Sequence, residues 1–145
     1  MSSSSVAVLV QVAATFVWLG MVVAISLLEA PLKFRAPDVT LRIGLGIGRI
    51  VFRALNGVEA GLASVVVVAA VLGTMPGRVS TGVLVAVAVL VLQLLAVRPA
   101  LTRRSDRVLA GEIVPRSRAH VGYVVTEAVK VVALLLTGVL ALSSL

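Results

Sequence analysis

Five polar side chains lie inside apolar stretches of this sequence, where a polar group is costly unless it has a partner or a function. Asn56 and Glu59 interrupt one apolar run, Gln93 interrupts the next, and Glu127 and Lys130 interrupt the last. Hydrocarbon offers no water to such groups, so they must face protein, a cavity or the membrane interface. A carboxylate in a low-dielectric interior can load and release a proton or a cation, and an ammonium there can hold an anionic group. These residues therefore predict a ligand or ion pocket.

The same side chains also admit a purely structural interpretation. Glu127 and Lys130 are three residues apart, which on a helix lets them pair with each other. Glu59 can pair with Lys130 or with Arg53 in the same way. Such pairs would fix the register of the helices without binding a ligand, and the residues alone leave both interpretations open.

No grouping of residues in the sequence indicates catalysis. The chain has no cysteine, which excludes disulfides, thiolate metal sites and cysteine nucleophiles. His120 is the single histidine, and one histidine cannot build a zinc or haem site alone. The run from Gly44 to Gly48 has glycine at alternate positions, which is not the dinucleotide fingerprint. We therefore predict no catalytic residue, no metal and no cofactor, and an intramembrane enzyme is the least favoured class.

The composition indicates a membrane protein. Apolar residues make up 60 % of the 145 residues, against about 45–50 % in a soluble domain, and the mean hydropathy is +1.17. The formal net charge is +7, from 13 Lys and Arg against 6 Asp and Glu. These basic residues cluster between the apolar runs, where anionic lipid attracts them. No nucleic-acid motif accompanies the charge, so we expect no nucleic-acid partner.

Four apolar segments predict four membrane-spanning helices, at about residues 6–28, 43–72, 79–97 and 119–142. Each is close to the length of about 20 residues that crosses a bilayer core of about 30 Å. We expect Pro31 to end or kink the first helix and Pro99 to stop the third. The predicted fold class is all-α: a single domain over residues 1–145, packed as an integral membrane four-helix up-down bundle.

The distribution of charge predicts the topology. The two long loops, 29–42 and 98–118, hold nearly all of the Lys and Arg, whereas the turn between the second and third helices holds only Arg78. The positive-inside rule places both loops in the cytoplasm and both termini outside, in the cytoplasmic (plasma) membrane. The buried polar side chains of three helices then lie at similar depth, and we expect their pocket to face the cytoplasm.

Lipids and other membrane proteins are the expected partners. Anionic headgroups are predicted to contact five basic residues, Lys33, Arg35, Arg42, Arg49 and Arg53. Gly57 and Gly61 form a small-xxx-small pair, which lets another helix approach closely. That approach is either ordinary packing inside the bundle or the interface of a homo-oligomer or a partner membrane subunit.

Four short motifs carry a resemblance to a known family: Trp18-Leu-Gly20, Pro31-Leu-Lys-Phe-Arg35, Gly48-Arg-Ile-Val-Phe52 and Arg118-Ala-His120. The chain resembles four-helix bacterial membrane domains of unknown function, which are related to the eukaryotic transmembrane protein associated with cisplatin resistance. The resemblance covers most of the chain and implies four spans, but it brings no established activity. One departure is Glu127, because the family often has Asn in the last helix.

Two functions are consistent with these expectations. The first is a small carrier, or a protein that binds a solute, an ion or a lipid in a cytoplasm-facing polar pocket. The alternative is a non-catalytic accessory or scaffold subunit of a membrane complex, whose polar residues only pack it.

Overall fold

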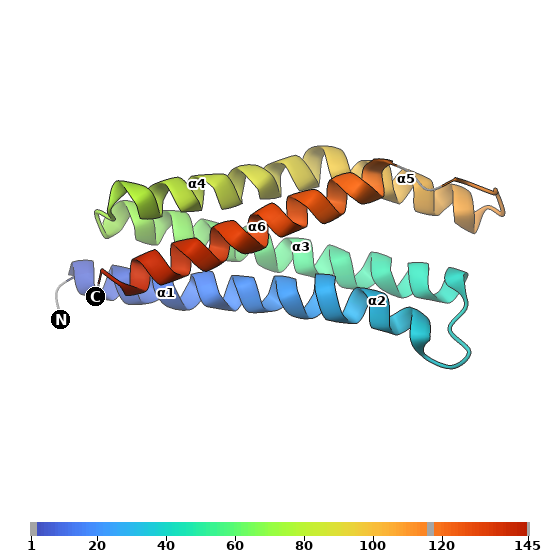
Figure 1. Cartoon of the computed structure of the whole chain (residues 1–145), viewed down its shortest axis with the longest axis horizontal. Coiled ribbons are helices and arrows are strands. Elements are labelled where there is room, and N and C mark those ends of the chain that lie inside the picture. Colours follow the sequence, from blue (N-terminus) through green and yellow to red (C-terminus); the bar gives the residue numbers. More distant parts are fainter. Residues whose placement is uncertain (1–2, 116–117, 145) are drawn as a thin grey trace.

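Four helical rods run alternately in opposite directions along the long axis of the molecule (Figure 1). This computed structural model describes residues 3–115 and 118–144. The first rod, Ser3–Arg35, joins α1 (Ser3–Val22), η1 (Val23–Glu29), α2 (Ala30–Leu32) and η2 (Lys33–Arg35). The second rod is α3 (Leu41–Leu72). The third, Gly77–Leu109, joins α4 (Gly77–Leu92), η3 (Gln93–Val97) and α5 (Arg98–Leu109), and the fourth is α6 (Arg118–Leu142).

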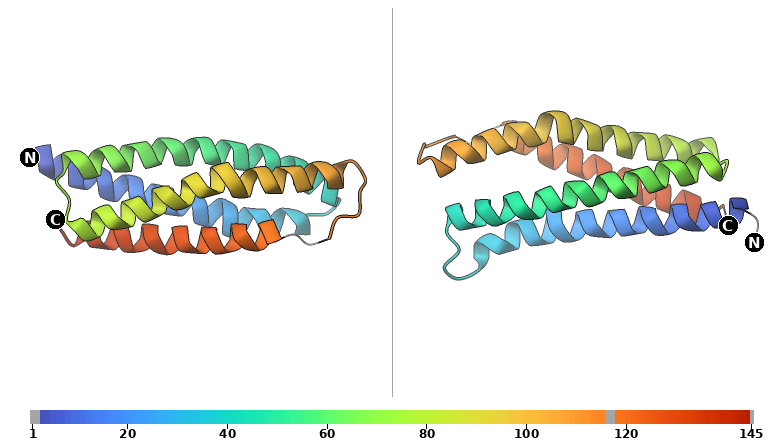
Figure 2. Two further views of the ribbon diagram at one scale, coloured as in Figure 1. Left: turned by 90° about the horizontal axis from the view of Figure 1, so that it is seen from above. Right: turned by 180° about the vertical axis from the view of Figure 1, so that it is seen from behind.

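The rods pack as an up-down-up-down bundle, which confirms the predicted fold class. The α1 helix packs against α3 and α6, and α4 packs against α6 and α3. The two views in Figure 2 place both termini at one end, together with the turn between α3 and α4, and the two longer connections at the other end. We call these the terminus end and the loop end. That the loop end faces the cytoplasm stays a prediction.

The outward faces of the bundle are apolar. Large side chains such as Ile50 and Leu95 are 74 % and 75 % exposed, and many other Val and Leu side chains point outward along all four rods. A soluble protein rarely exposes so large a contiguous apolar surface, whereas a lipid-facing helix must. All four rods are long and apolar enough to cross a membrane. The chain is therefore organised as a multi-pass membrane protein.

Pro31, expected to end or kink the first helix, and Pro99, expected to stop the third, both lie inside the rods. Pro31 and Pro99 each come shortly after a π-helical segment, η1 and η3 respectively. A proline lacks an N–H and its ring clashes with the carbonyl four residues earlier. A π-turn widens the helix and shifts the hydrogen bonds to i→i+5 spacing. This relieves the clash, so the helices continue beyond the prolines. The prediction that residues 29–42 and 98–118 are loops was therefore wrong for most of their length.

The glycine-rich stretch after the first connection is helical, as expected. Thr40 caps α3, because its hydroxyl accepts a hydrogen bond from the Ile43 amide at 3.3 Å. Gly44 and Gly48 are buried where α3 meets the end of the first rod. The ring of Phe34 lies directly over Gly44, and a Cβ atom at Gly48 would be 3.0 Å from the Lys33 Nζ. A side chain at Gly44 would therefore displace the Phe34 ring, and one at Gly48 would displace the end of the Lys33 side chain.

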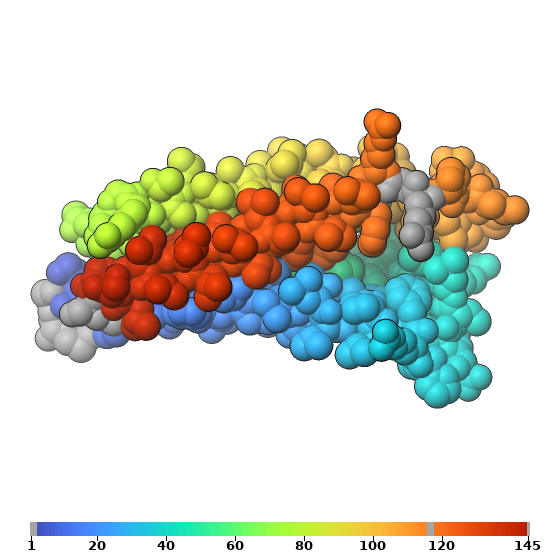
Figure 3. Space-filling model, in the orientation of Figure 1, coloured from blue at the N-terminus to red at the C-terminus, as the bar shows by residue number. Residues whose placement is uncertain are grey.

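The apolar core fills the half of the bundle nearer the terminus end. It is built mainly from small and β-branched side chains, with one large ring, that of Trp18. Its members are Ala14, Trp18, Val22, Ala63, Val66, Val83, Ala86, Leu90, Ala133 and Leu134. In Figure 3, α6 lies across the front of the molecule between α1 and α4. Lipid gives no hydrophobic drive for helices to associate, so their association depends on close packing. Small residues allow that close packing here.

Replacing Gly82 with Ala should destabilise the contact between α4 and α6. The new Cβ would fall on the side chain of Thr137, whose own Cβ is 3.2 Å from that position. The Thr137 hydroxyl is held by a 2.6 Å hydrogen bond to the Ala133 carbonyl, so the helices must separate. We expect a loss of about 1–3 kcal/mol, measured by unfolding in mixed detergent micelles with Trp18 fluorescence. Gly20→Ala is the matched control, because no atom lies within 4 Å of its added Cβ. Equal stability of the two variants would contradict this packing.

Candidate functional site

Polar side chains from all four rods meet near the middle of the bundle. We call Glu59, Gln93, Glu127 and Lys130 the polar cluster. Glu59 comes from α3, Gln93 opens η3, and the other two come from α6. The convergence that the sequence predicted for these residues is present. The cluster is closed, however, because none of its side chains is more than 2 % exposed.

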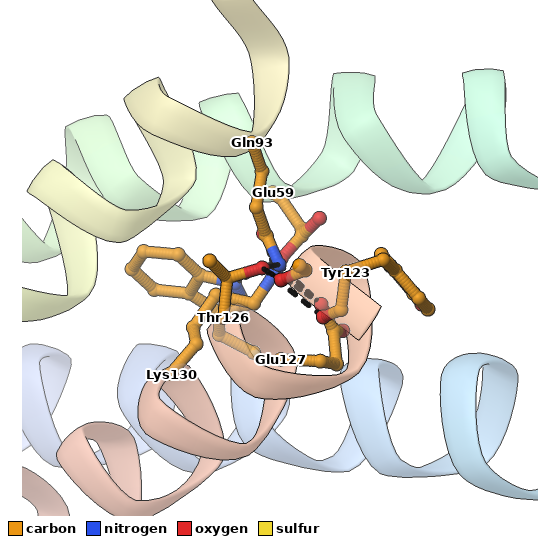
Figure 4. A network of polar contacts seen from close by, with 8 residues as sticks. Glu59, Gln93, Tyr123, Thr126, Glu127 and Lys130 are labelled. Atoms are coloured by element: carbon orange, nitrogen blue, oxygen red, sulfur yellow. Dashed lines mark hydrogen bonds and ion pairs between the residues drawn. The ribbon is translucent and has the colours of Figure 1, made fainter. Parts of the chain in front are cut away.

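The ammonium of Lys130 lies at the centre of the polar cluster (Figure 4). Its Nζ is 2.5 Å from Glu59 Oε1 and 2.7 Å from Gln93 Oε1, and it is 3.4 Å from Glu127 Oε2. An ammonium has three N–H donors and no acceptor. Lys130 therefore donates hydrogen bonds to Glu59 and Gln93 and forms an ion pair with Glu127, so its charge has three oxygen neighbours.

Two further side chains complete the contacts of the polar cluster. Trp18 of α1 donates its indole N–H to Glu59 Oε1 at 2.9 Å. The Gln93 amide nitrogen donates to Glu127 Oε2 at 2.6 Å and to the Thr126 hydroxyl at 3.0 Å. The same hydroxyl donates to the Gly122 carbonyl at 2.8 Å, so its oxygen is free to accept. These partners fix which end of the Gln93 amide faces Lys130.

The charges of the polar cluster do not balance. Two carboxyl groups surround a single ammonium, which leaves one net negative charge when both carboxyls are ionised. Glu127 Oε1 is buried, and in residues 3–115 and 118–144 it has no hydrogen-bond partner. Hydrocarbon disfavours an unpaired charge strongly. A proton or a small cation would balance it, so the arrangement can serve as a structural lock or as a site for one positive charge.

Four residues singled out in the sequence lie outside the cluster. Asn56 is half-buried, and no hydrogen bond to it is found within the described part of the chain. Gly57 and Gly61 are exposed, and a Cβ atom added at either would have no atom within 4 Å. They therefore do not pack against another helix of the same chain, and their role in an oligomer stays a prediction. Arg53 is also exposed, so it does not form the pair with Glu59 that the structural interpretation considered.

The five basic residues expected at headgroups divide into two groups. Arg35, Arg42 and Arg53 are exposed and available to lipid. Arg49 instead pairs with Asp106 at 2.6 Å, which ties α3 to α5. The side chain of Lys33 is only 9 % exposed and pairs with Glu29 at 3.3 Å. His120 is exposed at the start of α6, and no cluster of His, Asp and Glu that could hold a metal is found in the described residues.

Sequence reasoning did not assign Trp18 and Thr126 to the site. A signal for Trp18 was present, because it falls on the same helical stripe as Gln11 and Thr15, and all three are buried. Thr126 gave no such signal, since a threonine in an apolar helix usually bonds to its own backbone. Here it does so and accepts from Gln93 as well.

Replacing Lys130 with Met should destabilise the bundle strongly. Two buried carboxyl groups would lose their shared cation, which costs about 3–5 kcal/mol in comparable sites. Arg107→Met is the control, because it breaks the exposed Arg107–Glu112 pair and should cost at most about 1 kcal/mol. Unfolding in mixed micelles, followed by circular dichroism, measures both.

A triple variant separates unpaired charge from lost packing. Combining Lys130→Met with Glu59→Gln and Glu127→Gln removes every charge of the polar cluster, and it should recover part of the lost stability. If the triple variant is less stable than Lys130→Met alone, buried charge is not the source of the loss.

Comparison of the chain with protein-family models, with curated proteins and with solved structures found no match. The family resemblance carried by the four short motifs therefore stays a prediction. The four long apolar helices of the fold indicate a multi-pass membrane protein.

Proposed function

We propose that this chain is a non-catalytic accessory or scaffold subunit of a membrane complex. The observation that carries the proposal is the closure of the polar cluster, whose four side chains are at most 2 % exposed and bond to one another. A carrier has to hydrate and release its cargo, so its polar residues usually line a water-filled cavity. A closed, mutually paired set instead holds the four rods at one relative height.

The polar cluster acts as a lock on helix register. Its contacts join α1, α3, η3 and α6, because Trp18 meets Glu59 and Lys130 meets both Glu59 and Gln93. Sliding one rod by a helical turn, about 5.4 Å, would break these contacts and leave buried groups unpaired. A bundle with a fixed register presents a fixed outer surface, which is the property that an accessory subunit needs.

The outer face of α3 is the proposed surface for a second copy of this chain. Gly57, Ala60, Gly61 and Ser64 are exposed there at helical spacing, and the Ser64 hydroxyl bonds back to the Ala60 carbonyl at 2.8 Å. This face has no large side chain to keep another helix at a distance. The same face on two copies is self-complementary, as a two-fold dimer requires.

A second candidate is a carrier of a proton or a small cation. The specific observation in its favour is the excess carboxyl group of the polar cluster, together with the unpaired Glu127 Oε1. A site that lacks one positive charge and one donor can accept a proton at that oxygen. This function requires the cluster to open during turnover.

Glu59→Gln separates the two functions. The amide keeps an oxygen that can accept from Trp18 but removes the charge that pairs with Lys130. For a scaffold we expect lower stability and a smaller assembled particle, and no proton flux above that of empty liposomes for either protein. For a carrier we expect flux in the native protein that the variant loses while its stability is kept.

The measurements are unfolding in mixed micelles, light scattering, and pH change inside proteoliposomes under an imposed membrane potential. The control is Glu112→Gln, which changes an exposed carboxyl outside the bundle. Flux that depends on Glu59 and leaves stability unchanged would overturn the scaffold proposal.

Gly61→Cys should form a disulfide-linked dimer on oxidation in membranes. The chain contains no native cysteine, so the only thiols are the introduced ones. A disulfide requires the two Cα atoms to approach within about 7 Å, which the exposed α3 face permits. Leu84→Cys on the exposed side of α4 is the control and should stay monomeric on a denaturing gel. Equal cross-linking at both positions would count against an α3 interface.

A further inference from the structure

A second group of polar atoms lies beside the polar cluster. The Nε and Nη2 atoms of Arg98 are buried and form no hydrogen bond within the described residues. The buried hydroxyls of Tyr123 and Ser26 lie next to them and interact with each other. They come from three rods, through α5, α6 and η1. Buried polar atoms in proteins are almost always satisfied. The two Arg98 nitrogen atoms therefore require a partner that the described part of the chain does not supply.

Contacts between aromatic rings and the guanidinium hold this group together. The Arg98 Cζ lies 4.2 Å from the ring centre of Phe52 and 5.0 Å from that of Tyr123. The two rings meet edge to face, with centres 5.9 Å apart and planes at 77°. The Tyr123 hydroxyl lies beside Ser26. Stacking on a ring fixes the plane of a guanidinium, so the direction of its N–H groups is set in advance.

The unpaired atoms match the needs of an oxyanion. Nε–H and the neighbouring Nη2–H of an arginine lie along one edge and bind two oxygens of a carboxylate or a phosphate side by side. Tyr123 and Ser26 add a pair of hydroxyl groups from other rods, of which one O–H remains to donate to a ligand. Arg98 forms no ion pair with any residue of the described chain, although it is a cation enclosed on two sides by rings. Its charge is therefore met by the faces of aromatic rings and by no carboxylate of the described residues.

Neighbouring charges favour an anion with a single charge. Lys33 lies 5.3 Å from the ring centre of Phe52, on the same side chain that Arg98 covers, but it is already paired with Glu29. Glu127 and Glu59 of the polar cluster interact electrostatically with the Tyr123 hydroxyl and oppose further negative charge. A phosphodiester or a carboxylate carries one charge, whereas free phosphate carries more at neutral pH.

The position of Arg98 along the third rod agrees with a lipid phosphodiester as the ligand. It directly follows the apolar segment of the third rod and opens α5, which carries Arg103, Arg104 and Arg107. An arginine at that position lies at headgroup level, where lipid phosphodiesters are concentrated.

We propose that Arg98, Tyr123 and Ser26 form a binding site for a singly charged oxyanion at the loop end of the bundle. The ligand is the phosphodiester of an anionic lipid headgroup or a free anion of the same chemistry. This site is separate from the proposed scaffold function, since it uses none of the four residues of the polar cluster.

The full-length protein in a neutral detergent tests the proposal. The probes are dihexanoyl phosphatidylglycerol, sodium acetate and sodium phosphate, each added at constant ionic strength. Binding is measured by native mass spectrometry for the lipid and by the shift of thermal unfolding, read from Trp18 fluorescence, for all three. We expect the lipid to bind at least about tenfold more weakly to Arg98→Gln than to the native protein.

Two further variants keep the test decisive. Tyr123→Phe keeps the ring that stacks on Arg98 and removes only the hydroxyl, so it should fold normally and bind about threefold to tenfold more weakly. Arg103→Gln removes an exposed charge from the same helix and should bind as the native protein does.

Competition between the probes distinguishes the two sources of the ligand. Lipid binding that acetate and phosphate do not displace supports the headgroup as the ligand, and displacement by acetate supports a free carboxylate. Three results would overturn the proposal. They are native affinity in both Arg98→Gln and Tyr123→Phe, an equal loss in Arg103→Gln, and no binding of any probe to the native protein, which would leave water as the partner of these atoms.

Discussion

Pairing one ammonium with two carboxyl groups inside an apolar bundle is the constraint on which the rest of the structure depends. Moving a charge out of water costs several kcal/mol, and only close partners offset that cost. Lys130 finds them on α3, on η3 and on its own helix, while Trp18 of α1 bonds to the same Glu59 oxygen. Every rod must therefore sit at one height and one rotation, because any other arrangement separates Lys130 from these partners.

The apolar remainder of the chain cannot impose that register by itself. Val, Leu and Ala side chains pack almost equally well after a small shift, and lipid competes for the same surfaces. The two halves of the bundle contribute differently to helix association and to helix register. Near the terminus end, close contacts such as Gly82 against Thr137 and Gly138 against Phe16 bring the helices together. At the middle, the polar cluster decides which of the closely packed arrangements is formed.

Periodicity and charge predicted the four spans and brought Glu59, Gln93, Glu127 and Lys130 to one layer, because depth depends on position along a helix. That this layer is closed to solvent could not be predicted from the sequence, because closure depends on the rotation of each helix and on side-chain conformation.

The prolines show a second limit of prediction from sequence. A π-turn carries one extra residue, which rotates the next part of the helix by about 100° relative to an ideal helix. The face on which Arg98 lies could not be extrapolated across η3, and neither could the continuation of the helix past Pro99.

The two polar layers differ in which kind of hydrogen-bonding group lacks a partner. This difference indicates which layer is suited to an external ligand. In the polar cluster Lys130 contacts three oxygens, and the buried acceptor Glu127 Oε1 has no partner in the described residues. In the neighbouring layer the groups without a partner in the described residues are donors, the Nε–H and Nη2–H of Arg98, beside the hydroxyls of Tyr123 and Ser26. The groups of the polar cluster bond mainly to one another, whereas the Arg98 donors have no partner in the described residues. An external group with acceptor oxygens is therefore suited to the loop end. There it can accept hydrogen bonds from those donors without breaking the contacts of the polar cluster.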